Sequence, residues 1–312
     1  MGGRVMVFAP APVLTVTVEK VAGRDELHVH AGGQGVWQAR MAASLGCRVE
    51  LCAGIAGEIG DVLEGLLCRA DPAITLHAVR CAAGSGWYVH DRRGGERAEI
   101  AADSGEPPTR HDIDELYNTA LIEGMRADVS ILSGPADHSL IDPDVYRRLA
   151  ADLGSNGGKV VADLSGDLLE AVLDGGVAVV KVSHEELIAD GLADGDDEAS
   201  LVRAARRMRE RGAGAVLVSR AGDPALAMLD ERVVSVRPPK LEVVDHRGAG
   251  DSMSAGVAAV LAAGGGLAAA IRTGAAAGAL NVTRHGLGTG HGDAVRELAG
   301  RTRIETLTWS RK

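Results

Sequence analysis

The chain has 312 residues, of which 46% are hydrophobic but only 2% aromatic, and its 33 Lys and Arg against 43 Asp and Glu give a formal net charge of −10. This length allows one large domain with a buried core, which must be built from Ala, Val, Leu and Ile against abundant Gly. The acidic balance argues against nucleic acid or an anionic membrane as partner, so a small-molecule ligand is expected.

The four cysteines, at positions 47, 52, 68 and 81, form no Cys-x-x-Cys pair and have no His-x-x-x-His partner at zinc spacing. We interpret them as buried thiols of a reducing cytoplasm. The N-terminal apolar run is too short for a signal peptide. The hydrophobic stretch from Met253 to Leu280 contains several glycines and Arg272, which predicts two packed helices and no membrane span.

The N-terminal part begins with short strands. Val5–Phe8 is apolar, Val13–Val18 alternates apolar residues with Thr, and Leu27–His30 alternates again, as in a small sheet or lid. The glycine-rich turn 31–35 then leads into a helix that ends at Gly46. Two histidines on the third strand have no further ligand near them, so no metal site is expected there.

Strands and helices alternate through the middle of the chain. The predicted strands are 48–53, 74–79, 129–132, 159–162, 178–182 and 215–219, and the predicted helices are 59–70, 112–125, 143–153, 168–173 and 199–211. This alternation predicts a parallel, doubly wound sheet with helices on both faces. Two hairpins are also expected: 87–90 with 97–100, which projects, and 226–229 with 233–236, which forms an edge.

The ligand site of such a sheet lies at the carboxyl ends of its strands. Asp163, Ser183, Glu186, Ser219 and the loop at Gly248 all fall at these ends, so the sequence places them on one rim.

The string Gly248-Ala249-Gly250-Asp251 joins an apolar strand to an Ala-rich helix. Its glycines let the backbone turn tightly, so that N–H groups at the helix start face one point, where the helix dipole favours an anion such as a phosphoryl group. Asp251 either caps the helix or accepts a proton from a hydroxyl aligned on that group.

Five motifs occur in order along nearly the whole chain. They are Ala31-Gly32-Gly33-Gln34-Gly35, Leu132-Ser133-Gly134, Ala162-Asp163-Leu164-Ser165-Gly166, Lys181-Val182-Ser183-His184-Glu185-Glu186-Leu187, and Asp245 to Asp251 with Ser252-Met253-Ser254-Ala255-Gly256. Together they resemble the ribokinase-like, PfkB-type family of sugar kinases, most closely its branch of 1-phosphofructokinases and tagatose-6-phosphate kinases. The resemblance implies a mostly parallel α/β sheet in a single domain, 1–312, with a discontinuous β-sheet lid from about 13–30 and 85–101.

The resemblance also implies an ATP- and Mg²⁺-dependent kinase that transfers the γ-phosphoryl group to a hydroxyl of a sugar or sugar phosphate. Asp251 looks like the catalytic base, and the backbone N–H groups of Gly248, Ala249 and Gly250 like the anion hole. Glu186 matches the acidic end of an Asn-x-x-Glu motif that holds Mg²⁺ through water. The expected cofactor-binding residues are Ser183, Glu186, Ser219, Gly222 and Arg247, and the expected substrate-binding residues are Thr15, Gly32, Gly33, Gln34 and Trp37.

Several positions depart from the family's pattern. Thr15 stands where a carboxylate normally grips sugar hydroxyls, Gln34 replaces a Lys, and Ser183 replaces the Asn of Asn-x-x-Glu. The segment 83–86 lacks the usual Arg, and 220–224 departs from the usual glycine-rich nucleotide loop.

These departures bear on the substrate. Because the usual cations for a substrate phosphate are missing, the sequence predicts poor use of fructose 1-phosphate or tagatose 6-phosphate, unless Arg40 or Arg97 replaces them. Trp37 either stacks on a substrate ring or is simply packed, and Arg247 either contacts a phosphate or lies at the surface.

Two alternatives remain beside a sugar kinase: a catalytically weak regulator of the same fold that binds a metabolite, and a nucleoside kinase. The retained Gly-Ala-Gly-Asp string favours an enzyme. The lid strands also predict a homodimer, because their apolar residues would lack partners in an isolated sheet, the alternative being a monomer whose lid folds on its own core. These residues are Val16, Val18, Leu27, Val29, Trp87 and Val89.

Overall fold

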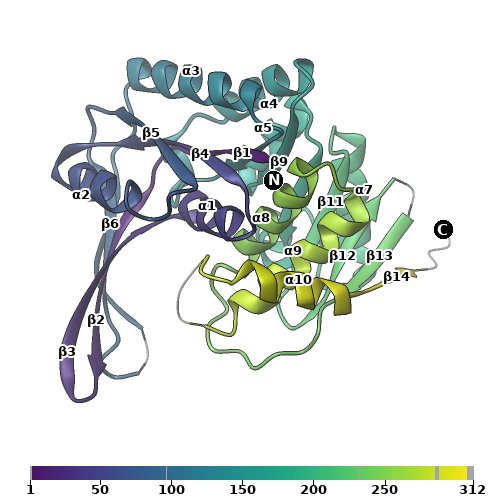
Figure 1. Ribbon diagram of the computed structural model, residues 1–312. Helices are drawn as coiled ribbons and strands as arrows, with labels where there is room; N and C mark the ends of the chain where they lie inside the picture. Colours follow the sequence, from purple (N-terminus) through teal and green to yellow (C-terminus); the bar gives the residue numbers. More distant parts are fainter. Residues whose placement is uncertain (1, 96, 231, 285–287, 308–312) are drawn as a thin grey trace.

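The computed structural model describes residues 2–95, 97–230, 232–284 and 288–307 (Figure 1). The strands of its large sheet are β1 (Arg4–Ala9), β4 (Arg48–Ile55), β5 (Ile74–Arg80), β8 (Val129–Ser133), β9 (Lys159–Asp163), β10 (Val179–Ser183), β11 (Ala215–Arg220), β12 (Asp223–Leu229), β13 (Arg232–Arg237) and β14 (Arg303–Leu307). A second sheet, called the lid sheet below, consists of β2 (Val13–Val21), β3 (Arg24–Gly32), β6 (Ser85–Asp91) and β7 (Ala98–Gly105).

The helices alternate with these strands. They are α1 (Gln34–Ser44), α2 (Gly57–Leu67), α3 (Arg110–Arg126), α4 (Pro143–Ser155), α5 (Gly166–Gly175), α6 (His184–Ala189), α7 (Glu198–Glu210), α8 (Ala249–Ala262), α9 (Leu267–Asn281), α10 (Gly292–Arg301) and the 3₁₀ helix η1 (His138–Leu140).

The large sheet has the strand order β14-β13-β12-β11-β10-β9-β8-β1-β4-β5 and is parallel from β5 to β11. Its strands are apolar on both faces because helices cover both. Along β1, Val5 and Val7 face the core under α1, α2, α8, α9 and α10, whereas Met6 and Phe8 face the core under α3 to α7. The doubly wound architecture predicted from the sequence is therefore confirmed.

The lid sheet projects from the large sheet, with the β2–β3 hairpin reaching farthest from it (Figure 1). Its order is β3-β2-β6-β7, and β6 and β7 form the predicted antiparallel hairpin. The two faces of the lid sheet differ, because alternate residues point to opposite sides. Thr15, Thr17, His28 and His30 line a cavity on one face, whereas Val16 and its apolar neighbours lie on the other.

Two expectations need correction. The hairpin of β12 and β13 exists but is not the edge of the sheet, because β14, which the sequence reading missed, pairs with β13 from Val233–Leu307 to Arg237–Arg303. The cysteines are free, but only Cys47 and Cys52 are buried, whereas Cys68 is exposed and Cys81 is partly exposed. The predicted helix pair at 253–280 is present as α8 and α9, and no helix of the described residues is long and apolar enough to cross a membrane.

Candidate active site

The N-terminus of α8 forms a prepared anion site. Gly248 is its N-cap with φ 71°, a left-handed conformation that glycine adopts without steric cost, and no side chain of the described residues caps the helix. The first N–H groups therefore stay free at the positive end of the helix dipole. Asn281 on α9 fixes the loop, since its Nδ2 donates to the carbonyl oxygen of Arg247 at 2.6 Å.

Gly250 has a different reason to be glycine. Its φ is not positive, but a Cβ there would lie 2.3 Å from Nζ of Lys181. The expectation that both glycines serve the turn is therefore correct only for Gly248, while Gly250 makes room for a buried ammonium.

Asp251 lies in the first turn of α8 and is only 8% exposed. It does not cap the helix. Burial raises its pKa to about 7, with further raising contributions from the charges of Asp163 and Glu186, while Lys181 and a hydrogen bond from Gln34 oppose the shift. A carboxyl group with a pKa near neutrality, next to an anion site, is suited to accept a proton from an alcohol.

Asp163 and Lys181 form a buried ion pair beneath this turn, with Nζ 3.0 Å from Oδ1. The two residues are directly opposite each other in the pairing of β9 with β10 and are 1% and 5% exposed. The other carboxylate oxygen of Asp163 accepts hydrogen bonds from Ser254 Oγ at 2.6 Å and from Gln38 Nε2 at 3.0 Å. Sequence analysis placed Asp163 on the rim but missed this network.

Glu186 begins α6 in a capping box with Ser183. The backbone N–H and the hydroxyl of Ser183 both donate to Oε2 of Glu186 at 2.7 Å, and no described residue bonds to Oε1. Glu186 lines both cavities described next. A hard oxygen ligand at this place fits a hydrated Mg²⁺ ion.

Two cavities meet beside Asp251. One of about 760 Å³, the lid cavity, lies against the lid sheet, and one of about 800 Å³, the strand-end cavity, lies at the ends of β10 and β11. Gln34 and Glu186 border both. The lid cavity contains all of the predicted substrate-binding residues, Thr15, Gly32, Gly33, Gln34 and Trp37, and the strand-end cavity contains Ser183, Glu186, Ser219, Gly222, Ala249, Gly250 and Asp251.

Arg247 lies elsewhere than predicted. It borders the lid cavity and not the strand-end cavity, and its Nε donates to Oδ1 of Asp245 at 3.0 Å. It is thus placed beside the expected substrate and not beside the expected cofactor.

The lid cavity is rich in basic side chains, which include Arg40, Arg97 and Arg247, named above as possible substitutes for the missing cations. They are Arg40, Arg92, Arg97, Arg247, His28, His30, His90 and His138. Arg97 bonds to Nε2 of His90, and Arg92 pairs with Glu19 at 3.3 Å. Arg40, on α1, is partly buried, and burial lowers its pKa, yet it has no hydrogen bond or ion pair with any described residue. A guanidinium without a partner at a cavity wall is suited to bind an anionic group of a ligand.

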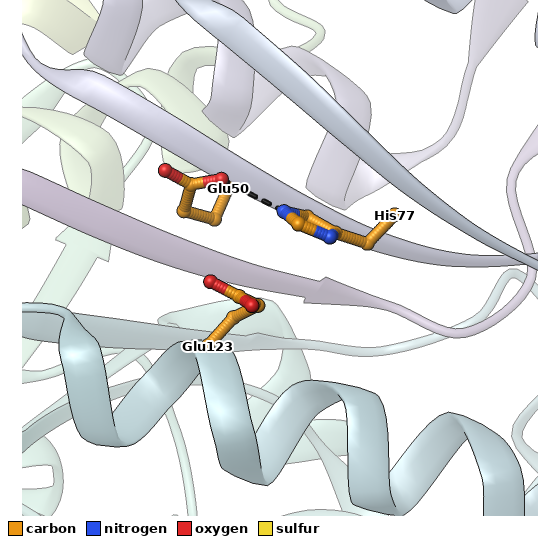
Figure 2. A group of neighbouring side chains, drawn as sticks. All are labelled: Glu50, His77 and Glu123. Carbon is orange, nitrogen blue, oxygen red and sulfur yellow. Dashed lines mark hydrogen bonds and ion pairs between the residues drawn. The ribbon is translucent and has the colours of Figure 1, made fainter.

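The described residues contain one cluster with metal-ligand spacing, Glu50, His77 and Glu123, near the beginning of β4 (Figure 2). None of these three residues lines either cavity. Its carboxylates already have partners. Arg4 binds an oxygen of each glutamate at 2.9 Å, His77 binds the second oxygen of Glu50 at 2.8 Å, and Arg126 binds the second oxygen of Glu123 at 2.9 Å. The cluster is therefore an ion-pair network and leaves no oxygen free for a metal.

Comparison with known proteins agrees with this geometry. A family model described as pfkB family carbohydrate kinase matches residues 5–292. The chain belongs to the PfkB family of carbohydrate kinases. Its residues are also 30% identical, over 245 residues, to a 1-phosphofructokinase of Haloferax volcanii, a match that covers 74% of this chain and 73% of that protein.

Solved structures share the fold of this carbohydrate kinase. The tetrameric inhibited form of phosphofructokinase-2 from Escherichia coli matches with a TM-score of 0.81 and 23% identity, over 96% of this chain and 99% of that one. Ribokinase from Arabidopsis thaliana, complexed with ribose and ATP, matches with a TM-score of 0.73 and 19% identity, over 96% and 98%. The kinase is thus ribokinase-like in fold, and its reaction is ATP-dependent phosphoryl transfer to a hydroxyl of a carbohydrate.

Proposed function

We propose that this kinase phosphorylates a hydroxyl of a sugar that already carries a phosphate, with ATP in the strand-end cavity and the sugar in the lid cavity. The observation that carries the proposal is the meeting of the two cavities at Gln34 and Glu186, beside Asp251 and the N-terminus of α8. A hydroxyl and a γ-phosphoryl group brought together there would face each other with the base and the anion site alongside.

In this proposal Asp251 accepts the proton of the attacking hydroxyl while the new bond to phosphorus forms. The free N–H groups of Gly248, Ala249 and Gly250 bind the phosphoryl oxygens, whose negative charge the helix dipole stabilises. Glu186 would hold Mg²⁺ through water at its free Oε1, and the ion would neutralise phosphate charge. Ser183 orients that carboxylate through its two hydrogen bonds.

Arg40 supports a phosphorylated substrate. Its guanidinium lines the lid cavity without a partner among the described residues, and bidentate binding of a phosphate would satisfy it. The basic lining favours a sugar phosphate over a nucleoside, whose sugar carries no charge. The relative in Haloferax volcanii, by its name, acts on a sugar phosphate. The replacement of Lys by Gln34 predicts the opposite preference, and the two predictions give different results in the following assay.

A coupled ADP-release assay over sugars, sugar phosphates and nucleosides tests this proposal, with Arg40→Met beside the wild type. We expect kcat/KM for the best sugar phosphate to fall by roughly ten- to a hundredfold in Arg40→Met, the effect of losing one charge-assisted contact. Turnover of the matching unphosphorylated sugar should change little. A wild type that prefers neutral sugars or nucleosides would contradict the assignment.

We also propose that the protein is a homodimer through its lid sheets. Contrary to expectation, Val16, Val29 and Trp87 already have partners, because they pack against the core. Leu27 and Ile100, farther out on the lid sheet, are 65% and 59% exposed, which leaves apolar surface for a second subunit to cover. The solved form of Escherichia coli phosphofructokinase-2 named above is tetrameric, which is compatible with self-association in this fold.

A further inference from the structure

One buried cation stands among three carboxylates at the α8 turn. Lys181 pairs with Asp163, and its charge also acts on Asp251 and Glu186. Burial works against the charged form of Lys181, but the three carboxylates outweigh that cost, so its pKa is raised and it stays an ammonium.

Lys181 is held in this place by burial and by its ion pair with Asp163. Its side chain is 6% exposed, and its Nζ and Cε occupy the space in which a Cβ on Gly250 would stand, at 2.3 and 2.9 Å. The neighbouring Asp163 is fully engaged through Lys181, Ser254 and Gln38. The ammonium is thus a fixed charge beneath the N-terminal turn that carries Asp251.

Other charges near Asp251 cannot replace it. Asp163, on β9, which packs on α8, and Glu186, on α6, which packs on β10, both disfavour an ionised Asp251. On α1, Gln34 contributes a hydrogen bond, and Arg40 lines the lid cavity. Arg4 on β1 is paired with Glu50 and Glu123, and Arg272 on α9 is exposed. Lys181, on β10, is the positive charge that acts on Asp251 among these elements.

We propose that Lys181 is a positioning residue for catalysis: its buried ammonium, packed beneath Gly250, stabilises the negative charge of the Asp251 carboxylate, the base of the reaction. The proposal rests on Asp251 being the base of the proposed reaction. Lys181 acts through Asp251 and does not itself exchange the proton.

The test is the pH dependence of kcat/KM in Lys181→Met. Removing the ammonium should shift the acid limb of the kcat/KM profile to higher pH by at least one unit. The value of kcat/KM should then be about tenfold lower on the acid side and recover as the pH is raised. Lys159→Met is the matched control, because Lys159 is an exposed lysine on the adjacent strand β9, and its profile should not move. A loss of the same factor at every pH would overturn the proposal, because a purely structural role predicts it.

A second pair of variants guards against misfolding, since Lys181→Met leaves Asp163 buried without its partner. Asp163→Asn removes that charge, and adding Lys181→Met to it then shows the effect of the ammonium on a neutral background. We expect the acid limb to lie at higher pH in the double variant than in Asp163→Asn, and equal limbs would contradict the proposal.

Carbon-13 NMR of the aspartate carboxyl carbons, without substrate, separates this inference from the proposed function. Asp251→Asn identifies the resonance, and its midpoint should rise in Lys181→Met even if the true substrate is not a sugar phosphate. An unchanged midpoint would refute the inference alone, whereas an unchanged turnover in Asp251→Asn would refute the function.

Discussion

At the scale of single residues, the site depends on a carboxyl group placed where burial and its neighbours make it half-ionised near neutral pH. Asp251 has that position, in the helix turn that forms the anion site and near the charges of Asp163, Lys181 and Glu186. Its pKa of about 7 makes it a stronger base than an exposed Asp, yet leaves it ionised in a large fraction of molecules.

Asp251→Asn should therefore lower turnover by roughly two to four orders of magnitude, the range for loss of a general base, while ATP affinity stays near normal. Steady-state kinetics and nucleotide binding by calorimetry measure the two effects separately. Turnover comparable to the wild type would show that another group takes the proton.

The same substitution should stabilise the protein at high pH. Because the pKa of Asp251 is raised from 3.8 to about 7 in the folded state, the folded state holds a proton there that the unfolded state has lost between these values. The contribution of Asp251 to stability is present below pH 4 and is lost as the pH rises to 7. Thermal unfolding should give a higher Tm for Asp251→Asn than for the wild type at pH 8, with the gap shrinking at pH 5, and an equal gap at both would argue against a raised pKa.

At the scale of elements, periodicity predicted most strands, because a strand covered on both faces is apolar throughout and one on a solvated face alternates. The same alternation in β2 and β3 puts Thr15 and His30 on the cavity face, a signal that could have revealed the basic lining. The Lys181–Asp163 ion pair could not be predicted from the sequence, because it depends on β9 and β10 being neighbours in one particular register. β14 was missed because its five residues follow a helix at the end of the chain and gain stability only by pairing with β13.

The lid sheet tests the proposed assembly. Light scattering of the wild type at micromolar concentration should show twice the 32.1 kDa chain mass, and Leu27→Lys with Ile100→Lys should reduce it to one, because two charges would replace exposed apolar contacts. Val62→Lys is the control, because Val62 is an exposed apolar residue of α2, outside the lid sheet. A dimer that persists in the double variant would mean that another surface makes the contact.

At the scale of the whole molecule, the two ends of the parallel strands differ in function: one end forms the ligand site and the other contains a stabilising ion-pair network. The carboxyl ends hold both cavities and Oε1 of Glu186, which has no hydrogen-bond partner among the described residues. The region near the start of β4 holds Glu50, His77 and Glu123 (Figure 2), which form an ion-pair network with Arg4. Glu50 and Glu123 are largely buried, and Arg4 is the residue that pairs with both of their carboxylates, so its loss would leave buried negative charge less compensated.

Arg4→Met should therefore lower the free energy of unfolding by about 3 kcal/mol, the lower end for removing one partner of a buried ion pair, because Arg4 itself is partly exposed. Urea unfolding measures the loss, and kcat should stay within about twofold of the wild type. The exposed ion pair of Arg301 with Glu297 gives the comparison, since Arg301→Met should cost less than about 1 kcal/mol. Equal losses would show that burial of the network adds nothing.

Because Lys181 contacts Gly250, the residue types that are tolerated at these two distant positions depend on each other. A side chain at 250 would require the end of Lys181 to move from its ion pair with Asp163, and a shorter residue at 181 would leave a void under the phosphate-binding turn. A Gly250→Ala substitution that is meant to stiffen the start of α8 would therefore require a second substitution at Lys181. We therefore expect positions 181 and 250 to covary among related sequences, which an alignment of the family can test.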